Sequence, residues 1–88
     1  MTKIALVTGG TRGIGGAISI ALKNQGCKVA ATYNSNSEKA DAFAKEHGID
    51  VFQWNVADAN ACEAGVKEVV EKLGSIDILI NNAGISKA

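Results

Sequence analysis

The stretch Thr8-Gly9-Gly10-Thr11-Arg12-Gly13-Ile14-Gly15 decides the fold, because it joins an apolar strand to an amphipathic helix. Residues 4–8 before it are a continuous apolar run of strand length, typical of a parallel strand covered on both faces. After it, apolar residues recur at the spacing of one helix face, at Ile14, Ala17, Ile18, Ala21 and Leu22. The order of strand, glycine loop and helix indicates the first unit of an α/β fold.

The glycine loop is suited to a phosphate group. The first amides of a helix have no partner within the helix, and the helix dipole places partial positive charge there. We expect Gly9 to make the turn, Gly13 to permit close approach of an anion, and Gly15 to let the helix pack near the strand. A strand–helix turn without a ligand is the alternative interpretation.

The rest of the chain repeats the alternation of strand and helix. Apolar runs predict strands at 29–33, 49–54 and 76–80, and helical spacing predicts helices over 40–47 and 62–73. Gly26, Gly48 and Gly74 follow the helical segments, and Asn60 with Glu63 resembles a capping box. The pattern predicts a Rossmann-type doubly wound α/β fold, with a parallel sheet in the strand order 3-2-1-4. We expect the third helix on the opposite face from the first two, and the fourth strand at an edge.

Composition excludes several classes of protein. Nine basic and nine acidic residues among 88 give a formal net charge of zero, which argues against a nucleic-acid binder held by bulk charge. No apolar run approaches the roughly 20 residues of a membrane span, and no signal-peptide pattern is present, so we expect a cytoplasmic protein. Cys27 and Cys62 are expected as reduced thiols. Because so short a chain is a marginal domain, we expect residues 1–88 to be the dinucleotide-binding half of a larger Rossmann domain.

Two motifs together resemble the short-chain dehydrogenase/reductase family. Thr8-Gly9-x-x-x-Gly13-x-Gly15 and Asn81-Asn82-Ala83-Gly84 each follow an expected strand, and the resemblance extends over the whole chain. Within the family the likeness is closest to acetoacetyl-CoA reductases of the polyhydroxybutyrate pathway, and nearly as close to 3-oxoacyl-carrier-protein reductases. It implies a reductase that acts on the 3-oxo group of an acyl thioester, without nucleic-acid or membrane partners, and a homotetramer at full length.

The segment after the second expected strand favours NADP(H). Residues 31–37 read Ala-Thr-Tyr-Asn-Ser-Asn-Ser and contain no acid that would accept hydrogen bonds from an unphosphorylated ribose. Arg12 in the loop and Lys39 at the start of the second helix are expected to contact the 2′-phosphate.

The resemblance implies the remaining cofactor contacts. Asn55 stands where most members have an aspartate whose carboxylate accepts a hydrogen bond from the adenine amine, and the amide oxygen of Asn55 is expected to do the same. Asn81 is expected to bond the backbone of a neighbouring strand, Trp54 to pack in the core and Asp58 to cap a helix. The predicted cofactor-binding residues are Gly9, Thr11, Arg12, Gly13, Ile14, Gly15, Asn34, Lys39, Asn55, Val56, Asn82, Ala83, Gly84, Ile85 and Ser86.

No catalytic residue can be assigned within the chain. Family catalysis uses a Tyr-x-x-x-Lys pair with a serine, but the one tyrosine here, Tyr33, is followed four positions later by Ser37. His47 precedes Gly48 and is expected to cap a helix, and no residues have metal-ligand spacing. Besides part of a reductase, two alternatives stay open: a non-catalytic NADP(H)-binding module, and an inert remnant that folds only with a partner.

Overall fold

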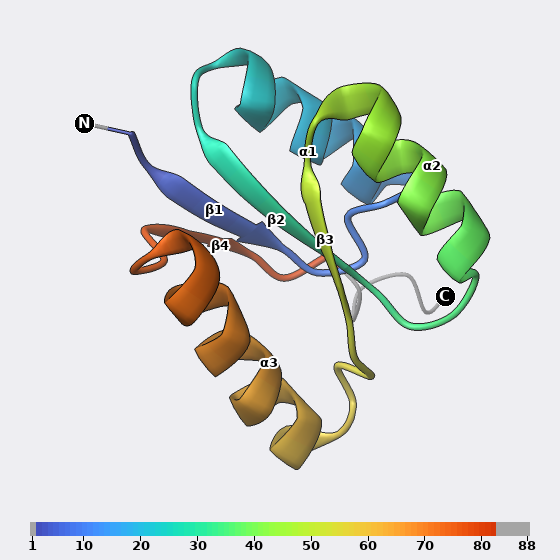
Figure 1. The fold of residues 1–88 in the computed structure, drawn as a ribbon, viewed down its shortest axis with the longest axis vertical. Helices are drawn as coiled ribbons and strands as arrows, with labels where there is room; N and C mark the ends of the chain where they lie inside the picture. The colour runs from blue at the N-terminus through green and yellow to red at the C-terminus, as the bar shows by residue number, and fades with distance from the viewer. Residues whose placement is uncertain (1, 83–88) are drawn as a thin grey trace.

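A computed structural model of the chain describes residues 2–82. Its elements follow the order β1 (Ile4–Val7), α1 (Gly13–Asn24), β2 (Lys28–Tyr33), α2 (Ser37–His47), β3 (Asp50–Gln53), α3 (Ala59–Leu73) and β4 (Ile78–Ile80). The four strands form one parallel sheet in the order β3-β2-β1-β4, as the sequence predicts (Figure 1). None of the described helices is long and apolar enough to cross a bilayer.

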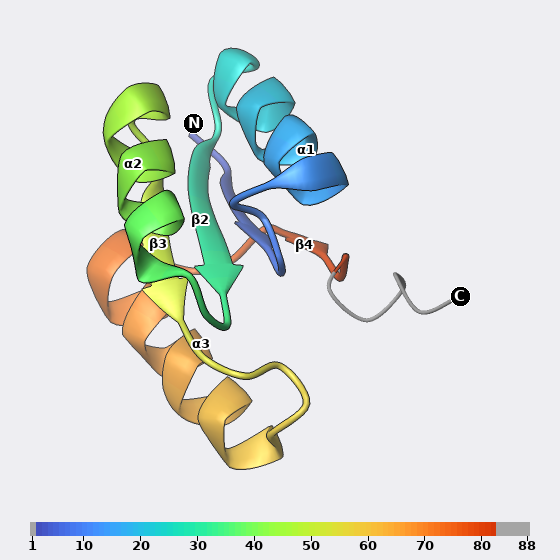
Figure 2. The same cartoon turned by 90° about the vertical axis from the view of Figure 1, so that its right-hand side faces the viewer.

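Helices cover both faces of the sheet. α1 and α2 lie together on one face and α3 lies on the other, so the predicted division of the helices is confirmed (Figures 1 and 2). Neighbouring residues of a strand point to opposite faces, which is why the strands read as continuous apolar runs. In β1, Leu6 belongs to the cluster under α3 and Val7 to the cluster under α1 and α2. In β2, Ala30 belongs to the cluster under α3 and Val29 to the cluster under α1 and α2.

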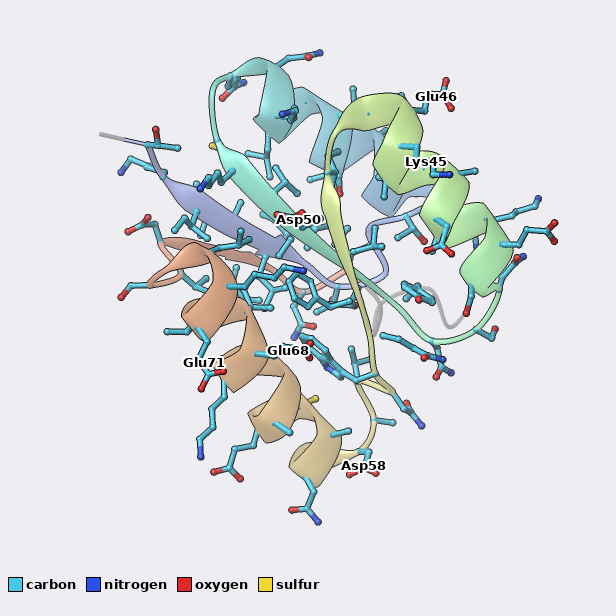
Figure 3. All side chains as sticks on the ribbon, in the orientation of Figure 1. Lys45, Glu46, Asp50, Asp58, Glu68 and Glu71 are labelled. Atoms are coloured by element: carbon cyan, nitrogen blue, oxygen red, sulfur yellow. The ribbon has the colours of Figure 1, made fainter. Side chains whose placement is uncertain are left out.

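The cluster under α3 is organised around a tryptophan. Trp54 is 8% exposed and packs with Phe52 of β3 and Val69 of α3, which confirms the predicted packing role. A Cβ atom at Gly65 would overlap the indole ring, so glycine lets α3 approach the sheet closely at this point. Charged side chains such as Glu68 and Glu71 lie on the exposed surface of α3 (Figure 3).

Several predicted boundaries shift by a few residues. The expected capping box of Asn60 and Glu63 is wrong, because Asp58 is the N-cap of α3 and accepts hydrogen bonds from the backbone amides of Asn60 and Ala61, at 3.0 and 3.1 Å. α2 begins at Ser37, before the first apolar residue of its buried face, with Asn36 as its cap. His47 lies in the last turn of α2 against the Phe43 ring, with the ring centroids 4.8 Å apart.

β4 is an outer strand of the described sheet. It is shorter than expected and begins at Ile78; the preceding Asp77 accepts a hydrogen bond of 2.9 Å from the Ile4 amide through Oδ2. Leu79 is 60% exposed, and Val66 and Val70 of α3 are also exposed on the α3 side of the sheet. The predicted edge position is therefore confirmed for the described part of the chain.

Candidate functional site: a cleft at the carboxyl edge of the sheet

An open cleft of about 900 Å³ lies where the strands end. Its walls come from the glycine loop, the segment between β2 and α2, the segment after β3, and Asn82 after β4. The carboxyl ends of parallel strands meet at one edge, and the chain reverses its direction of winding between β1 and β4. Such a switch point is where open α/β sheets bind ligands.

The cleft brings together every predicted cofactor-binding residue that the structure describes. These are Gly9, Thr11, Arg12, Gly13, Ile14, Gly15, Asn34, Lys39, Asn55, Val56 and Asn82. The other four, Ala83, Gly84, Ile85 and Ser86, lie outside the described residues. That these residues line one cleft does not test whether they bind a cofactor, so their assignment as cofactor-binding residues stays a prediction.

The glycine loop is held in place by β2. Gly9 has a φ of 63°, in the left-handed region that glycine adopts without strain, so it makes the predicted turn. The Gly9 amide donates a hydrogen bond of 3.1 Å to the buried hydroxyl of Thr32, and the Gly10 amide donates one of 3.1 Å to the Thr32 carbonyl. From the other side, the buried Ser19 hydroxyl of α1 donates one of 2.8 Å to the Gly10 carbonyl.

Gly15 has no room for a side chain. A Cβ atom there would overlap the carbonyl oxygen of Gly9 and would stand 2.6 Å from Nδ2 of Asn82. The expectation that Gly15 packs against the strand is therefore corrected: its neighbours are the loop itself and the residue after β4. Gly13 differs, since no atom stands within 4 Å of a Cβ placed on it, and its φ is 60°.

The N-terminus of α1 is chemically different from those of α2 and α3. Asn36 and Asp58 cap α2 and α3 through their side-chain oxygens. Arg12 occupies the same position before α1, yet it makes no side-chain cap. The amides at the start of α1 thus face the cleft without a side-chain acceptor, which fits an anion such as a pyrophosphate.

The charge of the cleft is positive and without a counter-charge. Arg12 and Lys39 line it, and no aspartate or glutamate is among the lining residues. Both cations are exposed, and within residues 2–82 neither forms an ion pair. Gln53 supports the segment beside them by donating a hydrogen bond of 3.0 Å from Nε2 to the carbonyl oxygen of Asn34.

The segment after β3 forms a tight turn. The Asp58 amide donates a hydrogen bond of 3.0 Å to the carbonyl oxygen of Asn55, and the Ala57 amide donates one of 2.9 Å to Oδ1 of Asn55. Cys62 of α3 lies beside the turn, with its Sγ 3.2 Å from the carbonyl oxygen of Val56. This thiol is free and half-buried, as is that of Cys27.

The two asparagines after β4 tie this strand to β1 and its loop. Asn82 Nδ2 donates a hydrogen bond of 3.3 Å to the Gly9 carbonyl. Asn81 was expected to bond a neighbouring backbone, but its described partner is the Thr8 hydroxyl, 3.3 Å from its Oδ1. Of these two asparagines, Asn82 is the one whose side chain has a described hydrogen bond to the backbone of a neighbouring segment.

Sequence reasoning missed part of the cleft lining. Thr32, Ser35, Asn36, Trp54 and Ala57 also line the cleft. Each is within a few positions of a strand end that was identified, so extending the site along those ends would have found them. Within residues 2–82, no group of three or more His, Cys, Asp or Glu side chains is placed to hold a metal ion.

Comparison with known proteins agrees with this geometry. The family model described as short chain dehydrogenase matches residues 3–88. This chain belongs to the short chain dehydrogenase family. Acetoacetyl-CoA reductase of Paracoccus denitrificans is 58% identical to it over 87 residues, which are 99% of this chain and 36% of the relative. A 3-oxoacyl-(acyl-carrier-protein) reductase of Staphylococcus aureus is 50% identical over 92 residues, which are 99% of this chain and 37% of the relative.

Solved structures show the same arrangement of strands and helices. A Bacillus thuringiensis protein assigned as a 3-oxoacyl-reductase superposes with a TM-score of 0.90 at 29% identity, covering 96% of this chain and 37% of that protein. The predicted Rossmann-type fold is confirmed. The chain spans little more than a third of the length of the curated relatives it matches, 36% for the Paracoccus reductase.

Proposed function

We propose that the full-length protein is an NADPH-dependent reductase of 3-oxoacyl thioesters, with acetoacetyl-CoA as its substrate. Residues 1–88 then supply the adenosine-phosphate end of the cofactor site, as part of a larger Rossmann domain. We place the protein in the cytoplasm, as a homotetramer, in polyhydroxybutyrate biosynthesis. Its partners are the cofactor and a small-molecule thioester, with no nucleic acid or membrane.

The choice of NADP(H) over NAD(H) rests on one observation. Arg12 and Lys39 line the cleft, within residues 2–82 they form no ion pair, and no carboxylate is among the lining residues. A 2′-phosphate prefers such a site, because it needs donors and positive charge and would be repelled by a carboxylate. An NAD(H) site would instead present an acid after β2.

Different parts of the cleft are assigned to different groups of the cofactor's adenosine end. The uncapped amides of α1 are placed for the pyrophosphate, Arg12 and Lys39 for the 2′-phosphate, and the turn after β3 for the base. Bound NADPH supplies a hydride to the substrate carbonyl. The family's Tyr-x-x-x-Lys pair has no counterpart among residues 1–88, so proton transfer to the substrate oxygen is assigned to residues beyond them.

The substrate choice rests on similarity to named reductases. The acetoacetyl-CoA reductase of Paracoccus denitrificans is 58% identical, against 50% for the Staphylococcus aureus carrier-protein reductase. Reduction of 3-oxoacyl-(acyl-carrier-protein) is therefore the second candidate. A third candidate is a non-catalytic NADP(H)-binding module.

NADPH oxidation by the full-length protein tests these candidates. With acetoacetyl-CoA we expect NADPH to be consumed at least about tenfold faster than NADH at equal, sub-saturating concentrations, since the phosphate contacts are worth about 1.5 to 3 kcal/mol. Faster turnover with an acyl-carrier-protein thioester would move the assignment to the second candidate. NADPH binding without turnover of either thioester would favour the binding module, and equal use of NADH would contradict the phosphate site.

A further inference from the structure

The segment between β2 and α2 contains two asparagines that are each followed by a serine, Asn34-Ser35 and Asn36-Ser37. Asparagine is chemically labile in such a setting, because the backbone nitrogen of a small following residue can attack the side-chain Cγ. Ammonia leaves and a cyclic succinimide forms; water then opens the ring and leaves aspartate or isoaspartate. The reaction requires an exposed residue whose backbone can turn toward its own side chain.

The fold restrains the second of these asparagines. Asn36 is the N-cap of α2, and its Oδ1 accepts a hydrogen bond of 3.3 Å from the Lys39 amide. Its carbonyl oxygen accepts another, of 3.2 Å, from the Ala40 amide. Bringing the Ser37 nitrogen to Cγ of Asn36 would break both bonds and disturb the first turn of α2. We therefore expect Asn36 to react slowly.

The first asparagine is held by much less. Asn34 is exposed and lies in a bend outside the helices and strands. Within residues 2–82 its side-chain amide has no hydrogen-bond partner, and its backbone carbonyl accepts an exposed hydrogen bond of 3.0 Å from Gln53 Nε2. Losing that bond costs about 0.5 to 1.5 kcal/mol, so the backbone of Asn34 can turn at a modest cost.

A carboxylate at residue 34 would change the chemistry of the cleft. Asn34 lines the cleft together with Arg12 and Lys39, and no acid is among the lining residues. An acid directly after β2 accepts hydrogen bonds from the 2′-hydroxyl of an unphosphorylated ribose. The same charge would offset one of the two cations and repel a 2′-phosphate. Deamidation would therefore move the site from NADP(H) toward NAD(H).

We propose that Asn34 is a site of spontaneous deamidation, and that the acid formed there converts a cleft that selects NADP(H) into one that accepts NAD(H). The reaction consumes water and releases ammonia, and it needs no other reactant. Its effect on the cofactor rests on the NADP(H) site proposed above. The difference in rate between Asn34 and Asn36 rests on the hydrogen bonds of the segment alone.

The first experiment measures the reaction itself. The full-length protein is incubated without cofactor at mildly alkaline pH, and peptide mapping by mass spectrometry follows asparagine, aspartate and isoaspartate at each position. Asn36 is the matched internal control, because it is also followed by serine. We expect Asn34 to react at least about fivefold faster than Asn36, since Asn36 must give up one hydrogen bond more. Gln53→Ala should accelerate Asn34 by about 2- to 10-fold and leave Asn36 unchanged. A rate at Asn34 no higher than at Asn36 would overturn the inference.

The second experiment measures the consequence for the cofactor. NADPH and NADH are titrated into the wild type, into Asn34→Asp and into Asn34→Gln, which changes the side chain without adding charge. We expect the preference for NADPH over NADH to fall at least about tenfold in Asn34→Asp and by much less in Asn34→Gln. The deamidated wild type, separated by ion exchange, should show the same fall, which keeps the test independent of how the variants fold.

An unchanged preference in both Asn34→Asp and the deamidated protein would overturn the switch of cofactor. If the unmodified wild type bound neither dinucleotide, the proposed NADP(H) site would be wrong, and the switch with it. The rates at Asn34 and Asn36 would still be decided by the first experiment, so the two failures are distinguishable.

Discussion

The side-chain amide of Asn82 donates a hydrogen bond of 3.3 Å to the carbonyl oxygen of Gly9, which stands 73 positions earlier in the chain. The bond joins the end of β4 to the first turn of the glycine loop, across the point where the sheet reverses its winding. The bond fixes the carbonyl group of Gly9, whose backbone amide already donates a hydrogen bond to the Thr32 hydroxyl. Asn82 therefore holds the glycine loop through the loop's backbone.

Replacing Asn82 by alanine should loosen this loop and weaken NADPH binding. Loss of one neutral hydrogen bond predicts an affinity about 5- to 10-fold lower and a free energy of unfolding lower by about 1 kcal/mol. Calorimetric titration and urea unfolding of the full-length protein measure the two effects. Asn60→Ala, at the exposed start of α3, is the matched control and should leave the affinity unchanged. Equal effects of the two substitutions would contradict the role given to Asn82.

Gly15→Ala should be much more damaging than Gly16→Ala. A methyl group at residue 15 would overlap the Gly9 carbonyl and crowd Asn82, whereas at residue 16 its nearest neighbour is 3.4 Å away, an ordinary contact. Both glycines are buried in the first turn of α1, so the pair separates the steric effect from helix propensity. We expect Gly15→Ala to lower the free energy of unfolding by about 1 to 3 kcal/mol and to weaken NADPH binding at least about tenfold. Thermal unfolding and titration of both variants check this, and similar behaviour would show that the loop shifts to make room for the methyl group.

Thr32 tests whether β2 holds the glycine loop. Its buried hydroxyl accepts a hydrogen bond from the Gly9 amide, and Thr32→Val removes that acceptor with little change of shape. A half-buried N–H left without a partner should lower the free energy of unfolding by about 1 kcal/mol. Thr32→Ser keeps the hydroxyl and should retain more of the stability in chemical denaturation. If Thr32→Val were as stable as the wild type, the hydrogen bond from the Gly9 amide to the Thr32 hydroxyl would not stabilise the loop.

The role of Thr32 also shows where sequence reasoning stops. The apolar runs, helical spacing and glycine positions sufficed for the strand order and the division of helices, because each depends on local pattern and on the handedness of crossovers. The Thr32 contact depends on register, since Val7 pairs with Ala31 and so places Thr32 beside the first residues of the loop. Registers between parallel strands are long-range and leave no mark on local spacing.

The cap of α3 illustrates a second limit. The sequence predicts a capping role for both Asp58 and Asn60; the role of Asp58 is confirmed, and the choice between the two depends on where the turn after β3 ends. That turn is set by hydrogen bonds from Ala57 and Asp58 back to Asn55, which cannot be read from helical periodicity. The cleft residues, in contrast, could be located because they follow strand ends, and the carboxyl ends of parallel strands are brought together by topology alone.

Arg12→Glu should distinguish NADPH from NADH. Arg12 is exposed, lines the cleft and forms no ion pair within residues 2–82, so its charge is available to a 2′-phosphate. Reversing that charge should weaken NADPH binding by about 10- to 100-fold, while NADH, which lacks the phosphate, should change by no more than about threefold. Because the site is open to solvent, the difference should shrink as salt is raised from low to physiological concentration.

Lys45→Glu is the control for Arg12→Glu, because it makes the same change of charge on the exposed surface of α2, outside the cleft lining (Figure 3). Its NADPH affinity should stay within about twofold of the wild type at physiological salt, where exposed charges beyond about 8 Å are screened. Fluorescence titration, with Trp54 in the cleft wall as the reporter, measures the affinities of the wild type and of both variants. Equal weakening of NADPH and NADH by Arg12→Glu would mean that Arg12 supports the loop rather than the phosphate, and the preference for NADP(H) would then lose its main support.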